Sequence, residues 1–197
     1  MASAAPELGM LSRLDLSTSG IVVFAANPEA YKEAKTLQEH ELLIKSYTFI
    51  ASRRGTMAGG LVGSRPLECP QDLQSLLGQG GEIEIASRFR AFGPRGARVA
   101  CLGAEEGTEK EKRAAPGIYR TSLRLLGSNK SAVLGEATIH RGFRHQIRAH
   151  LAWAGFPILG DTLYGGLGAE RMYLEASSVE LRRIGAPPLR FGLAKDY

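Results

Sequence analysis

Short alternating runs of hydrophobic and polar residues recur along the chain and predict more strands than helices. Four runs have the period of two or the β-branched content that is typical of strands, at residues 43–51, 118–126, 131–140 and 172–181. Because Gly127-Ser128-Asn129 separates the second run from the third, we predict that these two form a hairpin. The short apolar run at residues 21–26 predicts a further, buried strand.

Two segments have helical signals. Asn27 and Pro28 form an N-cap and first-turn pair, and the helix that they start is expected to end at about His40. A second helix is predicted at residues 143–154, closed by Gly155. Since strands outnumber helices, and no repeat or domain boundary is evident, we expect one α+β domain over residues 1–197 with a mostly antiparallel sheet and a few flanking helices.

Composition is that of an ordinary globular protein, with 44% hydrophobic and 23% charged residues among 197. No apolar run approaches the roughly 20 residues that a membrane helix needs, and the first residues lack the basic and apolar parts of a signal peptide. Cys69 and Cys101 fit no metal or redox spacing, so we interpret them as reduced, although a disulfide between them stays open. A cytoplasmic protein that does not bind membranes is therefore expected.

Basic residues exceed acidic ones by 25 to 20, a modest surplus that weakly favours a polyanionic partner. Its distribution is more informative, because four arginines alternate with Phe89 and Phe92 around a Gly-Pro bend: Arg88, Arg90, Arg95 and Arg98. Basic and aromatic residues in such a loop suit an RNA backbone with unstacked bases. The same pattern also suits a solvated hairpin tip whose phenylalanines lie under the core, and the sequence does not decide between the two.

Arg144 and Arg148 lie four residues apart on the second predicted helix, where like charges repel each other. No acidic residue lies between Glu136 and Asp161, so the two arginines are expected to meet anions from outside the helix, either a carboxylate elsewhere in the fold or phosphate. The alternative for Arg148 is a surface side chain that extends its charge into water.

Other polar residues are ambiguous when each is taken alone. Asp15, among Ser and Thr, has the composition of a turn, and Tyr47 suits a core position, a cross-strand pair or a stacking platform. His140, His145 and His150 are five residues apart, which does not place them on one helix face for a metal. We interpret His150 as a hydrogen-bonded, half-buried residue. With no phosphate-loop or dinucleotide motif either, neither a metal nor a cofactor is expected.

Taken together, four segments resemble the signatures of the RluA-type family of RNA pseudouridine synthases. They are Arg-Leu-Asp-x-x-Thr-Ser-Gly, Lys-x-Tyr, His-Gln-Ile-Arg-x-His-Leu and Pro-Ile-x-Gly-Asp-x-x-Tyr-Gly, in the family's order, at residues 13–20, 45–47, 145–151 and 157–165. The resemblance spans most of the chain, with a looser match over residues 55–117. It implies the pseudouridine synthase catalytic fold and an isomerase that converts uridine to pseudouridine in structured RNA, either ribosomal or transfer RNA.

The resemblance also implies roles for individual residues. Asp15 matches the nucleophilic aspartate, Arg148 the arginine that pairs with it, and Tyr47 the tyrosine that stacks on the target base and takes a possible part in proton transfer. Arg13 matches the arginine that fills the gap when uridine leaves the stack, because flipping a base costs a few kcal/mol that such contacts offset. We assign further RNA contacts to Lys45, Arg88, Arg90, Arg144 and Gln146. A monomer is the default expectation.

The chain departs from the family's pattern at its start. Family members carry additional strands before the Arg-Leu-Asp motif, which this chain reaches at residue 13, and no S4-type RNA-binding domain is recognisable. Either the fold has a shorter sheet edge, or the natural start lies upstream. A competing hypothesis is therefore a catalytically silent RNA-binding module derived from such an enzyme. The presence of both Asp15 and Arg148 counts against it, since a pure binder gains nothing from an internal ion pair.

Overall fold

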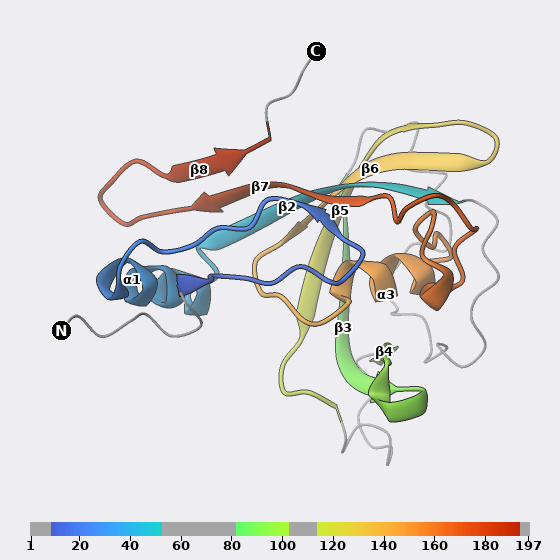
Figure 1. Ribbon diagram of the computed structural model, residues 1–197, viewed down its shortest axis with the longest axis horizontal. Helices are drawn as coiled ribbons and strands as arrows, with labels where there is room; N and C mark the ends of the chain where they lie inside the picture. The colour runs from blue at the N-terminus through green and yellow to red at the C-terminus, as the bar shows by residue number, and fades with distance from the viewer. Residues whose placement is uncertain (1–8, 53–81, 103–113, 194–197) are drawn as a thin grey trace.

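The computed structural model describes residues 9–52, 82–102 and 114–193. Within these ranges one eight-stranded sheet has the order β1-β7-β2-β6-β5-β3-β4, with β8 on the remaining part of β7 (Figure 1). Among the described strands, only β1 and β7 pair in parallel. The strands are β1 Ser19–Gly20, β2 Leu43–Ser52, β3 Glu82–Phe92, β4 Arg98–Leu102, β5 Tyr119–Ser128, β6 Ala132–Ile139, β7 Leu174–Leu181 and β8 Leu189–Gly192. This confirms the predicted α+β class and the β5–β6 hairpin.

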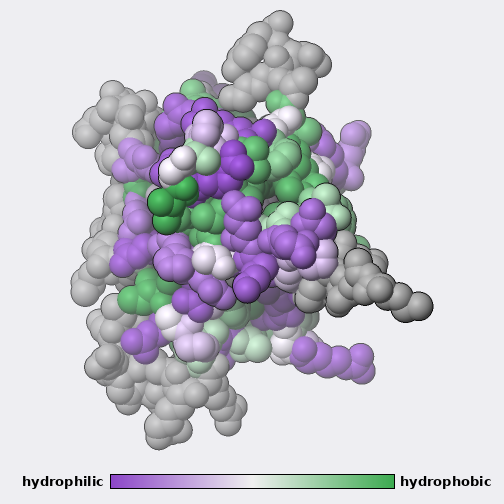
Figure 2. Space-filling model, turned by 90° about the vertical axis from the view of Figure 1, so that its left-hand side faces the viewer, coloured by the Kyte–Doolittle hydropathy of each residue, from purple (hydrophilic) through white to green (hydrophobic). Residues whose placement is uncertain are grey.

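Two α-helices, α1 (Pro28–Glu39) and α3 (Gln146–Trp153), lie on the same side of the sheet in Figure 1. The start of α1 is as predicted, because Asn27 Oδ1 accepts a hydrogen bond from the Ala30 N–H at 2.8 Å. Its apolar side packs on β2 and β7 through a cluster that contains Leu11, Val23, Ala34, Leu37, Leu43, Val179 and Leu181. Figure 2, which shows the end of the molecule with α1, has hydrophilic residues interspersed with hydrophobic ones on this outer face.

The second helix begins three residues later than its predicted start at residue 143. His145 adopts a left-handed φ of 57°, which interrupts the helical backbone, and the Gln146 side chain accepts a hydrogen bond from the Phe143 N–H at 2.9 Å. Gly155, at φ +88°, follows the helix where a left-handed residue was predicted to close it. Every residue of α3 is buried, so Arg148 is an interior side chain and not the surface arginine of the alternative interpretation.

The predicted buried strand at residues 21–26 is wrong. Strand β1 already ends at Gly20, and of the following residues only Phe24 makes a ladder contact, an isolated bridge to Met10. The apolar run follows an extended path against residues 9–11, where Val23 is buried while Val22 and Phe24 are exposed. Residues 9–11 are too short a partner to form a sheet with this run, so only one bridge forms. The apolar character of the run does not show how long its partner is.

Residues 82–102 form two paired strands around a one-turn 3₁₀ segment, Pro94–Gly96. Phe89 is fully buried, and its ring stacks on that of Phe143 at 5.0 Å between centroids. The hairpin interpretation is therefore confirmed for Phe89. Arg88 and Arg90 flank it in the strand and so point to the opposite face of β3.

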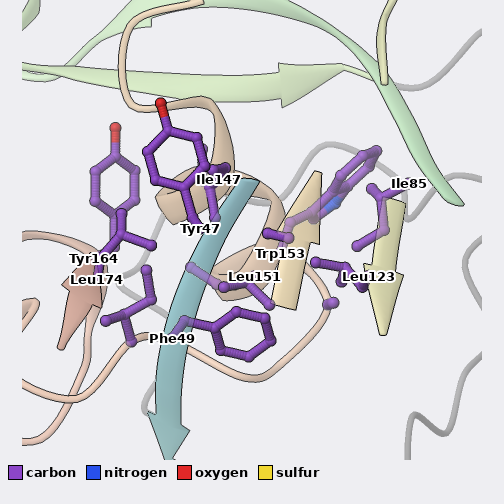
Figure 3. Close-up of a cluster of buried hydrophobic side chains, with 14 of the residues drawn as sticks. Tyr47, Phe49, Ile85, Leu123, Ile147, Leu151, Trp153, Tyr164 and Leu174 are labelled. Carbon is purple, nitrogen blue, oxygen red and sulfur yellow. The ribbon is translucent and has the colours of Figure 1, made fainter. Parts of the chain in front are cut away.

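The main core lies between the sheet and α3. Figure 3 shows Tyr47 and Tyr164 at one end of this cluster, with both hydroxyls directed away from Phe49 and Leu151. Cys101 is buried in β4, whereas Cys69 lies outside the described residues. Among the described residues, no helix combines the length and apolar character that crossing a membrane requires.

Candidate active site

Polar residues from three of the sequence motifs line one pocket of about 430 Å³, among them Asp15, Lys45, Tyr47 and Arg148. Ser12, Arg13 and Leu14 complete the wall that carries Asp15, and residues 142–147 complete the wall that carries Arg148. The volume lies within the range of small-ligand sites. The predicted catalytic residues, far apart in the sequence, are thus brought together.

Asp15 is positioned by its attachment to β7. The motif's last two residues form β1, which pairs with Glu175 and Ala176, and Gly20 lies so close to the Ala176 backbone that a Cβ there would be 2.3 Å from its carbonyl oxygen. The Thr18 N–H donates to the Asp15 carbonyl oxygen at 2.9 Å, so the predicted turn is present. The turn does not use the carboxylate, which faces the pocket and Arg148.

Arg148 connects two carboxylates. Its Nη1 donates to Asp15 Oδ2 at 3.4 Å, while its Nε and Nη2 donate to the two oxygens of Asp161 at 2.7 and 2.8 Å. The exposed fractions of the side chains are 8% for Arg148, 21% for Asp15 and only 1% for Asp161. Of the two predicted alternatives for Arg148, a carboxylate or phosphate, the structure shows carboxylates from elsewhere in the fold. The one at the pocket surface is Asp15.

The guanidinium stays charged in this setting. Burial by itself lowers the pKa of Arg148, but the hydrogen bonds to Asp161 and the negative charges of Asp161 and Asp15 outweigh it, so the pKa is raised overall. This fixed positive charge lies beside Asp15, whose carboxylate is the group in the pocket that can act as a nucleophile.

Tyr47 forms part of both the core and the pocket wall. Its burial, and secondly the negative charge of Asp15, raise the pKa of its hydroxyl to about 12. The phenol is therefore protonated at neutral pH and can donate a hydrogen bond. Its ring presents an apolar surface next to Asp15, which suits a stacked base.

Asp161 and Tyr164 were not assigned roles from the sequence, although both belong to the Pro-Ile-x-Gly-Asp-x-x-Tyr-Gly motif. The Tyr164 hydroxyl accepts from the Val99 N–H at 2.9 Å and lies 3.0 Å from His145 Nδ1, while Arg148 lies over its ring at 5.1 Å from the centroid. Burial, and secondly the charge of Arg148, lower the pKa of His145. The sequence signal for this pair was Asp161 itself, the first acidic residue after Arg148, which lies 13 residues before it.

The residues predicted to contact RNA fall into different settings. Arg13 is exposed at the pocket, and Lys45 is buried in its wall. Arg144 also lines the pocket, but its Nη2 donates to backbone oxygens of the β3–β4 turn, those of Gly96 and, at 3.1 Å, Arg98. Its anion-binding role stays a prediction.

Gln146 lines the pocket with its amide already hydrogen-bonded within the fold, whereas Arg88 and Arg90 lie outside the lining. The Gln146 amide nitrogen donates to the Arg120 carbonyl oxygen at 2.8 Å, and its oxygen already accepts from Phe143. Arg88 and Arg90 are not in the pocket lining. Contacts of these three side chains with RNA stay predictions.

His150 is hydrogen-bonded as predicted, but it is fully buried where the sequence predicted half-burial. It lies 2.8 Å from both Ser87 Oγ and Thr121 Oγ1, and burial lowers its pKa to about 3, so the ring is neutral. The described ranges contain no cluster of three or more His, Cys, Asp or Glu side chains that could hold a metal ion.

Comparisons with known proteins identify several relatives of this chain. Ribosomal large subunit pseudouridine synthase D of Buchnera aphidicola is 25% identical over 99% of this chain and 50% of its own length. tRNA pseudouridine synthase C of Vibrio cholerae is 27% identical over 92% of this chain, and dual-specificity RNA pseudouridine synthase RluA of Vibrio vulnificus is 29% identical over 88%. The chain spans 65% and 60% of these last two relatives.

A solved structure has the same fold. Human RNA Pseudouridylate Synthase Domain Containing 1 superposes with a TM-score of 0.63 over 93% of this chain and 67% of its own, at 20% sequence identity. The family model described as RNA pseudouridylate synthase matches residues 2–153, a stretch that contains Asp15, Tyr47 and Arg148. This chain therefore belongs to the RNA pseudouridylate synthase family, and its resemblance to the RluA-type members is confirmed.

Proposed function

We propose that this chain is an RNA pseudouridine synthase, an isomerase that converts uridine to pseudouridine in ribosomal or transfer RNA with Asp15 as the nucleophile. The observation that carries the proposal is the arrangement of Asp15, Tyr47 and Arg148 around one pocket, with Asp15 held beside a buried, charged guanidinium. The names of the relatives supply the two RNA classes.

The reaction breaks the bond between uracil N1 and ribose C1′ and forms a bond between C5 and C1′, with loss of the C5 proton and gain of a proton at N1. The Asp15 carboxylate can attack C1′, or it can add to C6 of the ring, and both routes require it to be ionised. Arg148 places a positive charge beside the carboxylate, and its own hydrogen bonds to Asp161 fix the position of that charge.

Tyr47 is assigned to stack on the uracil, because its ring lines the same pocket as Asp15. With a pKa of about 12 its hydroxyl is a proton donor and not a base at neutral pH. Arg13, exposed at the pocket, is assigned to the gap that the flipped uridine leaves in the RNA. The proposal includes a monomer that acts in the cytoplasm.

The test is release of tritium from cellular RNA labelled at C5 of uridine, taken from cells that lack this protein. Isomerisation exchanges the C5 hydrogen with water, so the assay needs no knowledge of the target site. We expect release from the unaltered chain and none from Asp15→Asn, with RNA binding retained by both. Tritium release by the Asp15→Asn chain would refute the assigned nucleophile. Binding without release by the unaltered chain would favour the silent RNA-binding module.

A further inference from the structure

Lys45 is a buried cation in the pocket wall that has no partner in the part of the chain that the structure describes. Only 5% of the residue is exposed, and among the described residues its ammonium makes no ion pair or hydrogen bond. Arg148, the other buried cation of the pocket, has two carboxylates. Among the described residues, Lys45 is thus a cation of this wall that has no carboxylate to compensate its charge.

An unpaired ammonium at such a position is unfavourable for folding, because burial removes it from water without supplying an opposite charge. Burial lowers the pKa of Lys45, and the positive charge of Lys35 lowers it further. An apolar side chain of similar length would fill the position at lower cost. The lysine is therefore better explained by a group that enters the pocket than by the folded protein.

The pocket leaves room for such a group next to the ammonium. A Cβ on Gly142 would lie 3.3 Å from Lys45 Nζ, so the glycine leaves space where another residue would crowd it. Gly142, Arg13 and Arg144 also line the pocket. Of the lining residues only Asp15 is acidic, and Arg148 already pairs with it.

The position of Lys45 relative to Tyr47 indicates what the group is. The two residues are separated by one residue on β2, so they face the same side of the sheet about 7 Å apart. A uracil against Tyr47 is neutral and cannot compensate the ammonium. The phosphodiester groups on either side of that nucleotide carry a permanent negative charge, and lysine is a common ligand of phosphate.

We propose that Lys45 Nζ binds a phosphodiester oxygen of the RNA strand next to the nucleotide that occupies the pocket. This inference rests on the proposed function for the identity of the ligand as RNA. It assigns to Lys45 the charge that holds the backbone in register, while Tyr47 and Asp15 act on the base and ribose.

Salt dependence of RNA binding tests this contact. Each phosphate that a protein neutralises adds about 0.7 to 0.9 to the magnitude of the slope of log K against log salt concentration. We expect Lys45→Met to weaken binding to purified transfer and ribosomal RNA and to reduce the slope by about that amount. The matched control is Lys130→Met, an exposed lysine in the β5–β6 turn, which should leave the slope unchanged.

Thermal unfolding distinguishes ligand binding from a structural role. Lys45→Met removes an unpaired buried charge, so its melting temperature should equal or exceed that of the unaltered chain. A lower melting temperature with an unchanged slope would overturn the inference, and so would an equal loss of slope in Lys130→Met. Loss of affinity without loss of slope would also overturn it, because it would indicate contact with a neutral group.

The tritium assay separates this inference from the proposed function. A reduced slope in Lys45→Met, together with absence of tritium release from the unaltered chain, would support the phosphate contact and reject the enzyme. Tritium release by the unaltered chain, together with the same salt slope in the unaltered chain and in Lys45→Met, would support the enzyme and reject the phosphate contact. If the unaltered chain does not bind RNA even at low salt, both are rejected.

Discussion

Asp161 binds two nitrogens of the Arg148 guanidinium, Nε at 2.7 Å and Nη2 at 2.8 Å, which leaves Nη1 to face the pocket. A bidentate pair of this kind fixes the plane of the guanidinium as well as its position. Asp161 therefore sets the orientation of Nη1, which makes the longer contact with Asp15 at 3.4 Å. Asp161 does not line the pocket, so we interpret it as a positioning residue.

Replacing Asp161 by Asn should affect both stability and activity. The amide keeps one acceptor but presents an N–H₂ group to the guanidinium, and breaking a buried ion pair costs about 3 to 5 kcal/mol of unfolding free energy. We expect tritium release to fall roughly 100-fold, the order of loss that follows a small misplacement in an active site. Urea unfolding and the tritium assay, performed well below the melting temperature, measure the two effects.

The control for Asp161→Asn is Glu84→Gln. Glu84 pairs with Arg120 at the surface, where the two side chains are 47% and 55% exposed, and such pairs contribute about 0 to 1 kcal/mol. Stability and tritium release should both stay close to those of the unaltered chain. Equal effects of the two substitutions would show that the burial of Asp161 is irrelevant.

Much of the candidate site was predictable because the motifs are specific in residue type and order. They indicated that Asp15, Tyr47 and Arg148 belong together, and the pocket contains all three. They did not indicate how the charges pair. Arg148 was matched with Asp15 alone, whereas its shorter contacts are with Asp161. Pairing depends on side-chain direction in the folded chain, which residue order does not specify.

The fold was least predictable where local pattern and tertiary contacts disagree. Buried residues alternate along β3 at Ile83, Ile85 and Phe89, but the arginines and the Gly93-Pro94 pair were compatible with both an RNA-binding loop and a hairpin tip. Conversely, the run at residues 21–26 is apolar enough for a strand and lacks an adequate partner. Strand formation requires a neighbouring strand, and that information is not local.

Gly20→Ala should displace the Asp15 segment from the sheet. The backbone of Gly20 has a φ of +111°, and a Cβ would lie 2.3 Å from the Ala176 carbonyl oxygen and 2.6 Å from its nitrogen. Strained backbone and overpacking each cost about 1 to 3 kcal/mol, so we expect a loss of that order or more in unfolding free energy. Tritium release should fall too, since β1 holds the Asp15 turn.

Gly127→Ala is the matched control for Gly20→Ala. A Cβ on Gly127 would have no heavy atom within 4 Å, so the change adds no clash. Its unfolding free energy should change by about 0.5 kcal/mol or less, as is usual for surface substitutions, and tritium release should not change. A similar loss in both alanine variants would contradict the close approach of β1 to β7.

Acid should destabilise the protein through His150. Its pKa is about 3 in the folded protein, against about 6.5 when unfolded, so between these values the unfolded state binds a proton that the folded state does not. Stability is therefore retained above pH 6.5 and is lost as the pH falls toward 3, by up to about 1.4 kcal/mol per pH unit. Urea unfolding at several pH values should show a smaller slope in His150→Gln, whereas His40→Gln, at an exposed position, should retain the full slope.

Alkaline pH should destabilise the protein through Tyr47. Burial raises its pKa to about 12 from an unfolded value near 10, so the folded state keeps a proton that the unfolded state loses. This contribution to stability is fully present below pH 10 and is lost as the pH rises toward 12. Of the chain's six tyrosines, Tyr47 and Tyr164 should both ionise late in an ultraviolet titration. Tyr47→Phe should remove one late-ionising group while retaining RNA binding, because phenylalanine still stacks; loss of an early-ionising group instead would contradict its burial beside Asp15.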